Sequence, residues 1–138
     1  QYVLAREGYD ANDLQANYRK VALWSAGDAK TQYLRTMASG NPQTPMKIYG
    51  ARSILHPTIK SISLLSRNSA LVRFDVERRE SGGTIGERQS YAVVVGFRYT
   101  GQPMRMEDRF LNPLGFQATS YRRDGELIGA TAAEQGIR

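Results

Sequence analysis

The spacing of apolar residues divides the chain into a helical first half and a strand-forming second half. In residues 12–25, apolar side chains recur every three or four positions, as on one face of an amphipathic helix. The same spacing predicts a second helix over residues 28–40, and residues 1–10 contain a further helical stretch. Thr44 and Pro45 predict a short additional helix, because proline is favoured at the first helical position.

After Pro57 the apolar period changes to two, which is typical of strands. In residues 71–79, Val72, Phe74 and Val76 alternate with charged residues, so this strand is expected to have one buried face and one face in water. The expected extended segments are residues 58–65, 71–79, 91–99, 104–111 and 116–123.

Helices followed by an antiparallel meander predict an α+β domain whose N-terminal helices cover one face of the sheet. We expect a curved, antiparallel four-stranded sheet around these helices, which is the cone-shaped, nuclear-transport-factor-two-like (NTF2-like) architecture. The 138 residues fit one domain, with a helical half over about 1–52, a sheet half over about 57–123 and a tail over 124–138. Enzymes also use this architecture, so the fold alone does not decide the function.

Composition excludes some functions and weakens others. The chain has no cysteine, so disulfides, thiolate metal sites and cysteine nucleophiles are excluded. A net charge of +6 would attract nucleic acid or an anionic lipid surface. The basic residues are scattered, however, and the densest pairs, Arg78-Arg79 and Arg122-Arg123, have acidic neighbours. We therefore expect ordinary surface charge, and nucleic acid is not the expected partner.

No group of residues has the spacing of a catalytic or metal site. His56 is the only histidine, and Pro57 after it predicts extended backbone. Asp75 and Glu77 alternate with Arg73 on the wet face of their strand, which favours cross-strand ion pairs over an acid–base pair. The sequence therefore predicts no catalytic residue, no bound metal and no cofactor.

A bulge or tight turn is expected where Asn112, Pro113, Leu114 and Gly115 interrupt the last extended segments. Pro113 has no N–H to give to a strand ladder, and Gly115 can adopt a positive φ. Asn112 can hydrogen-bond the backbone two residues further on. We expect this segment to shape the backbone rather than bind a ligand, and to turn Phe116 inward.

With this motif the sequence resembles the VirB8 family of type IV secretion systems. A lone Asn-Pro-x-Gly would be weak support, but the matching residues form an ordered series along nearly the whole chain. They are Tyr2-Val3, Arg6-Glu7, Tyr9-Asp10, Ile62-Ser63, Val72-Arg73-Phe74, Gly96-Phe97-Arg98-Tyr99, Arg109, residues 112–116 and Ser120-Tyr121-Arg122.

The resemblance implies a non-enzymatic assembly subunit of a channel for conjugation or effector export. It further implies a bitopic protein of the bacterial inner membrane, with an anchor upstream of Gln1 and this domain in the periplasm. The implied partners are the chain itself, as a homodimer or higher oligomer, and other channel subunits. Protein interfaces favour Tyr, Arg and Met, and the family has a groove between helix and sheet. We therefore expect partner contacts at Arg6, Tyr9, Met106, Glu107, Tyr121 and Arg122.

Two other functions remain open from the sequence. A small enzyme of the same cone-shaped fold, such as an isomerase or dehydratase, needs a deep pocket with a convergent acid or histidine. An interior filled by Trp24, Phe74, Phe97 and Phe116 would exclude that function. A single-stranded nucleic-acid-binding module needs aromatic platforms beside basic residues, but strand alternation places Arg98 on the face opposite its aromatic neighbours.

Overall fold

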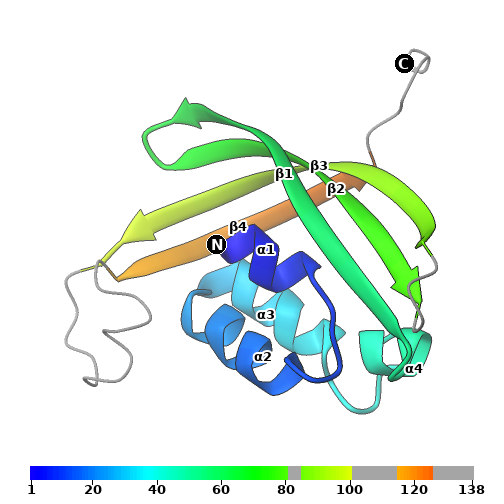
Figure 1. The fold of residues 1–138 in the computed structure, drawn as a ribbon. Coiled ribbons are helices and arrows are strands. Elements are labelled where there is room, and N and C mark those ends of the chain that lie inside the picture. The colour runs from blue at the N-terminus through cyan, green and yellow to red at the C-terminus, as the bar shows by residue number, and fades with distance from the viewer. Residues whose placement is uncertain (81–84, 101–114, 126–138) are drawn as a thin grey trace.

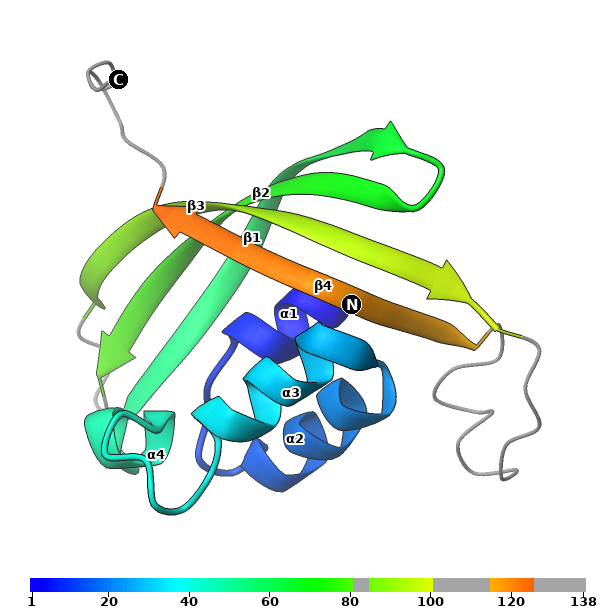
Figure 2. The ribbon, with the colours of Figure 1, turned by 180° about the vertical axis from the view of Figure 1, so that it is seen from behind.

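The computed structural model describes residues 1–80, 85–100 and 115–125. Its elements, in chain order, are α1 (Tyr2–Glu7), α2 (Leu14–Leu23), α3 (Gly27–Thr36), α4 (Pro45–Tyr49), β1 (Ser53–Ser66), β2 (Ser69–Glu80), β3 (Ile85–Tyr99) and β4 (Phe116–Gly125). The strands form one antiparallel sheet in the order β1-β2-β3-β4. Helices α1, α2 and α3 lie on one side of this curved sheet (Figures 1 and 2). The predicted α+β architecture is confirmed, while the expected segment 104–111 lies outside the described residues.

The core lies between the helices and the concave face of the sheet. Val72, Phe74 and Val76 of β2 are buried, and Phe74 is fully enclosed, which confirms the alternation expected for this strand. Val21 of α2 and Val93 of β3 are fully buried in the same cluster. Burying apolar side chains of this size typically stabilises a fold by about 1.5–3 kcal/mol each, so this layer holds helices and sheet together.

The sequence predicted a strand that starts after Pro57. In the structure β1 begins at Ser53, so Pro57 lies inside the strand. The N–H and C=O of Leu55 point away from β2, because they bond to Tyr9 at 2.8 and 3.1 Å. Alternation gives Pro57 the same orientation, so its missing N–H falls on the open edge of the sheet. Proline is therefore compatible with β1 because β1 is an edge strand.

A bulge in β1 changes which side chains face the helices. The pairing with β2 shifts between Ile59 and Ser61, which places one extra residue in β1. Ile59 lies opposite Phe74, and Ile62 lies opposite Val72, so both aliphatic side chains face the concave side. The bulge thus keeps the end of β1 apolar on its inner face.

The short helices begin and end largely where their local sequence predicts. Pro45 is the first residue of α4, and Gly50, with φ of 65°, ends it as expected. Helix α3 begins one residue before the expected Asp28, and it ends at Thr36 instead of Gly40. The start agrees within the one or two residues by which helix ends commonly vary, whereas the helix ends about one turn earlier than expected.

Gly115 has a φ of 68°, as the turn motif predicted. A Cβ at this position would lie 2.2 Å from the carbonyl oxygen of Thr100, and the Thr100 N–H donates to the Gly115 carbonyl at 3.0 Å. Asn112, Pro113 and Leu114 lie outside the described residues. Phe116 packs against the core cluster, which agrees with the expected inward orientation.

Candidate partner-binding surface

A cluster of polar and aromatic side chains fixes helix α1 to strand β4. We call it the α1 anchor, and it consists of Tyr2, Arg6, Glu7, Tyr121 and Arg123. The Arg6 guanidinium lies 4.0 Å from the ring centre of Tyr121 and donates to the Tyr2 hydroxyl at 2.7 Å. The Tyr121 hydroxyl donates to Glu7 Oε2 at 2.5 Å, and Arg123 Nη1 lies 2.7 Å from Glu7 Oε1. Every charged group of the anchor therefore has a partner within the chain.

Burial makes the anchor a set of fixed donors and acceptors. It raises the pKa of Tyr121, and the negative charge of Glu7 raises it further, so the phenol keeps its proton. Burial also raises the pKa of Tyr33, which lies beside Arg6, to about 12. The anchor therefore holds α1 by cation–π contacts and charge-assisted hydrogen bonds, in which the Tyr121 phenol stays a donor.

Tyr9 secures the chain just after α1. Its side chain is buried, and its hydroxyl donates to the carbonyl of Gly50. Its ring centre lies 5.7 Å from that of Tyr49 in α4. Burial raises the pKa of Tyr9, and the nearby Asp10 adds to the effect. Tyr9 thus joins the end of α1 to both β1 and α4.

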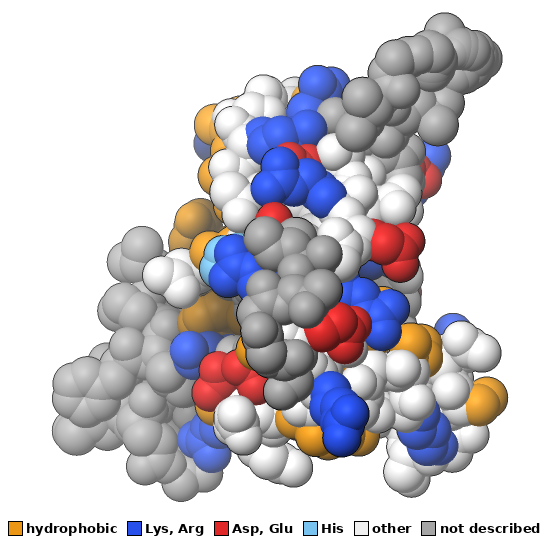
Figure 3. Space-filling view, turned by 45° about the vertical axis from the view of Figure 1, so that its right-hand side comes forward, with side chains coloured by type: hydrophobic (Ala, Val, Ile, Leu, Met, Phe, Trp, Pro, Cys, Tyr) orange, Lys and Arg blue, Asp and Glu red, His pale blue; other side chains and the backbone are white. Residues whose placement is uncertain are grey.

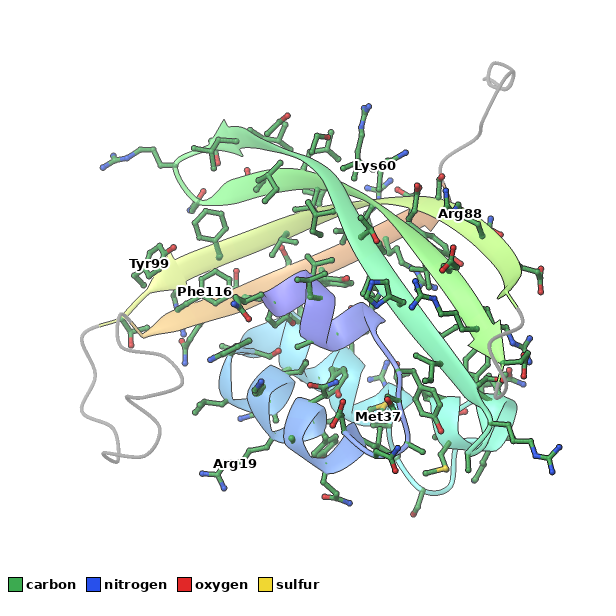
Figure 4. The ribbon with its side chains drawn as sticks, in the orientation of Figure 1. Arg19, Met37, Lys60, Arg88, Tyr99 and Phe116 are labelled. Carbon is green, nitrogen blue, oxygen red and sulfur yellow. The ribbon has the colours of Figure 1, made fainter. Side chains whose placement is uncertain are left out.

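An open hollow of about 650 Å³ lies beside the beginning of α1 on the concave side. We call it the apolar groove. Its exposed wall is formed by Ile62, Leu64 and Tyr99, which are 66%, 73% and 60% exposed. Tyr99 packs edge-on against Phe116, 5.7 Å between ring centres, at one end of the sheet (Figure 4). Its lining residues are Gln1, Tyr2, Val3, Lys20, Trp24, Ile59, Ile62, Leu64, Ala70, Val72, Val95, Phe97, Tyr99 and Phe116.

The chemistry of the apolar groove suits contact with another molecule better than catalysis. Lys20 is its one charged residue among the described lining residues, and none of them is Asp, Glu or His. The expectation of a filled interior is met in part, because Trp24 and Phe74 are buried whereas Phe97 and Phe116 are partly exposed along the groove. Side chains that remain exposed on a contiguous apolar surface typically mark a binding site.

A second hollow of about 180 Å³ lies near the other end of α1. It contains two carboxylates, Glu7 and Glu87, and two guanidinium groups, those of Arg78 and Arg123. Glu7 accepts from both Tyr121 and Arg123, so its oxygens are already engaged. The two carboxylates therefore do not form the free, convergent pair that general acid–base catalysis requires.

The convex face of the sheet carries mixed charge. Lys60 lies 3.4 Å from Asp75, and Arg88 lies 3.1 Å from Glu77, which confirms the predicted cross-strand ion pairs. The hydrogen bond from Ser90 is the main cause that lowers the pKa of Asp75, and the positive charge of Lys60 lowers it further. Lys60 and Arg88 project from the side away from the helices (Figure 4). On the face of the molecule seen in Figure 3, Lys and Arg side chains are likewise interspersed with acidic ones. This pattern differs from the continuous basic surface of a nucleic-acid binder.

Two negative findings concern the described part of the chain only. Residues 1–80, 85–100 and 115–125 contain no group of three or more His, Asp or Glu side chains that could hold a metal ion. Within these same ranges, every helix is too short or too polar to cross a bilayer.

The predicted partner residues occupy very different environments. Tyr9 and Tyr121 are buried, and Arg6 is half-buried against tyrosine rings, so all three hold α1 in place. Arg122 is exposed and lies 3.7 Å from Asp124. Met106 and Glu107 lie outside the described residues. Partner binding by these six residues stays a prediction.

The exposed wall of the apolar groove was missed by sequence reasoning. Ile62 and Leu64 have the alternation of an ordinary buried face, and no local signal separates them from core residues. Their exposure arises because the β1–β2 hairpin extends beyond the helices (Figure 1). A run of serines around them, at Ser61, Ser63 and Ser66, is the one hint that this strand end is less enclosed.

The family model for VirB8 protein matches residues 1–126. The chain belongs to the VirB8 family. Among curated VirB8-family relatives, the type IV secretion system protein virB8 of Bartonella henselae is 37% identical over 129 residues, which are 93% of this chain and 54% of that protein. PtlE of Bordetella pertussis, another type IV secretion system protein, is 36% identical over 91% of this chain and 54% of its own length. The chain thus spans about half the length of these relatives.

Solved structures of VirB8-family domains share the NTF2-like fold. The soluble domain of TrwG from Bartonella grahamii, part of a type IV secretion machinery, superposes with a TM-score of 0.84 at 38% identity, covering 92% of this chain and 89% of that one. VirB8 of Agrobacterium tumefaciens superposes with a TM-score of 0.85 at 23% identity over 93% and 88% of the two chains, which shows the shared fold. The predicted family and fold are both confirmed.

Proposed function

We propose that this chain is the periplasmic domain of a non-enzymatic assembly subunit of a type IV secretion channel. The observation that carries the proposal is the VirB8 family match over residues 1–126, because named relatives belong to secretion systems. The apolar groove supports it, since an open apolar surface with one lysine and no acid among its described lining residues suits protein contacts.

In this proposal the protein is held at the inner membrane by a segment upstream of Gln1, and the domain works by contacting copies of itself and other channel subunits. Arg6, Tyr9 and Tyr121 contribute by fixing the position of α1, because little of their surface is free. Arg122 is exposed enough to contact a partner directly, and Met106 and Glu107 stay candidates for the same surface.

Deleting the gene in the bacterium that carries it tests the function. We expect loss of substrate transfer by its type IV secretion system, and recovery when the full-length gene is supplied in trans. A full-length gene encoding Phe74→Asp is the matched control, because a buried charge at this fully enclosed position should unfold the domain and fail to restore transfer. Transfer that persists after deletion would overturn the proposal.

The proposed location has a separate test. A full-length protein fused at its C-terminus to alkaline phosphatase, which is active only outside the cytoplasm, should give active enzyme. The same fusion to a fluorescent protein that folds only in the cytoplasm should be dark. The opposite pair of results would contradict a periplasmic domain.

A further inference from the structure

The two halves of edge strand β1 differ in how the open edge is protected. In the first half, Tyr9 occupies the main-chain groups of Leu55, Pro57 lacks an N–H, and the bulge at Lys60 distorts the strand. Prolines, lysines and bulges are the devices by which natural sheets prevent further strands from adding. Residues 61–64, with the sequence Ser-Ile-Ser-Leu, carry none of these devices and are all exposed, and the next shift in pairing comes between Leu64 and Ser66, beside the hairpin turn.

The open main-chain groups and the apolar groove belong to the same residues. Because Leu55 directs its N–H and C=O away from β2, alternation directs those of Ile59 to the open edge as well. The bulge advances the pattern by one residue, so Ile62 and Leu64 also face the edge. Their side chains line the groove. A strand added here would therefore gain main-chain hydrogen bonds and place alternate side chains in the groove.

Charge favours an acidic partner over a second copy of this chain. Lys20 is the one charged group among the described residues of the groove, and the whole chain carries a net charge of +6. Antiparallel pairing of two copies along this edge would place two chains of this net positive charge side by side. Two positively charged chains repel each other, whereas a carboxylate near Lys20 would stabilise the added strand.

We propose that an extended segment of another protein adds to β1 along residues 61–64 as a fifth strand. This segment has alternating apolar residues, which enter the groove, and at least one carboxylate, which lies near Lys20. Strand addition of this kind derives affinity from main-chain bonds and specificity from side-chain pockets. The inference rests on the proposed function for the kind of partner, a further channel subunit, and on the structure for the surface.

A synthetic octapeptide, Val-Ser-Val-Ser-Val-Ser-Glu-Ser, is the first probe, because its valines and its glutamate share one face of an extended strand. The same peptide with lysine in place of glutamate is the control. With the parent chain, we expect the acidic peptide to slow amide hydrogen exchange at Ile62 and Leu64, whose N–H groups face the open edge. Leu64→Asp and Lys20→Glu should each weaken binding about tenfold or more, which corresponds to about 1.4 kcal/mol. Lys20→Arg, which keeps the charge, should bind like the parent chain.

Ser63→Asp is the matched control for Leu64→Asp. The two substitutions add the same charge at adjacent exposed positions, but Ser63 lies opposite Leu71 and its side chain faces the convex side. We expect it to leave binding unchanged, and unchanged melting temperatures would show that both variants are folded. Equal binding of both peptides, or no protection on β1, would overturn the proposal. Protection that rises with protein concentration in the absence of peptide would overturn it too, and would assign the edge to a second copy.

The result in cells separates this inference from the proposed function. After deletion of the gene, full-length Leu64→Asp should fail to restore substrate transfer, whereas full-length Ser63→Asp should restore it. If both variants restore transfer equally, the strand-addition inference is wrong and the proposed function stands. If transfer does not need the gene at all, the proposed function is wrong.

Discussion

The two ends of α1 meet the sheet in opposite ways. At its Glu7 end, buried charges and phenols of the α1 anchor are matched within the chain, down to both carboxylate oxygens of Glu7. At its Tyr2 end, the concave face opens into the apolar groove, where Leu64 is 73% exposed. Polar groups that are paired within the chain stabilise the fold and have few hydrogen-bonding sites left for a partner. The apolar groove differs, because its side chains are still exposed to water, and covering them with another molecule would be favourable.

Both ends depend on strand β4, which begins beside the groove at Phe116 and reaches the anchor at Tyr121 and Arg123. The outer edge of β4 is itself held, because Ala118 donates to the carbonyl of Trp24 at 2.7 Å. The sheet therefore has one edge tied down by the helical layer and one edge, the far half of β1, left open. This difference leads us to place intermolecular contact at β1.

Gly115→Ala should have the largest effect, because it disturbs the entry of β4 at the groove. The new Cβ would lie 2.2 Å from the Thr100 carbonyl oxygen at a φ of 68°. The positive φ and the overpacking together should lower the free energy of unfolding by about 3 kcal/mol. Urea unfolding measures this loss.

Gly27→Ala is the control for Gly115→Ala. Gly27 also has a positive φ, 55°, but the nearest atom to an added Cβ is 3.6 Å away. It should lose only the conformational part, about 1 kcal/mol. Equal losses in the two variants would show that contact with Thr100 does not restrict this turn.

The second prediction compares neighbouring arginines on opposite faces of β4. Arg123→Met removes a partner from Glu7, whose side chain is only 8% exposed, and should lower the free energy of unfolding by about 2 kcal/mol. Arg122→Met breaks a pair whose side chains are 82% and 65% exposed, and should change it by less than about 0.5 kcal/mol. Denaturant unfolding of both variants measures these losses. Similar losses would show that the enclosed Glu7–Arg123 pair stabilises the fold no more than the exposed Arg122–Asp124 pair.

Local sequence predicted the parts of the fold that depend on local chemistry. The alternation of Val72, Phe74 and Val76, the proline start and glycine end of α4, and the positive φ of Gly115 all follow from near neighbours. The bulge in β1 does not, because it depends on the register with β2. Without it, the inner face of residues 61–64 could not be deduced. The extension of β1 back to Ser53 depends on pairing with β2 as far as Glu80, which the local sequence does not contain either.

The functional surface was harder to predict, because buried anchors and interfaces use the same residue types. The enrichment of arginine and tyrosine at interfaces predicts partner contacts at Arg6 and Tyr121. In the structure these amphipathic side chains enclose each other, and the Tyr121 hydroxyl finds Glu7 from 114 residues away. Whether such a residue faces a partner or its own chain depends on that long-range contact, which the local sequence does not contain.

The third prediction, with a smaller expected effect than Gly115→Ala and Arg123→Met, concerns Asp75 on the convex face, where charges are matched but remain near water. The Ser90 hydroxyl donates to Asp75 at 2.6 Å, and this bond and then Lys60 lower the pKa of Asp75 below its ordinary 3.8. A lowered pKa in the folded state means that the stabilisation is present above pH 3.8 and is lost as the pH falls through the folded value.

Ser90→Ala should therefore lower the free energy of unfolding by about 1 kcal/mol near neutral pH, and the difference from the parent should shrink as Asp75 becomes protonated. Ser69→Ala removes a bond between two neutral hydroxyls, 2.7 Å from Ser66, so any loss should not vary with pH. Unfolding curves across the acidic range compare the two variants. A pH-independent loss for Ser90→Ala would mean that the Ser90 hydroxyl stabilises the fold by packing. The polar pairs of the convex face would then differ from those of the α1 anchor, which stabilise the fold by charge-assisted hydrogen bonds.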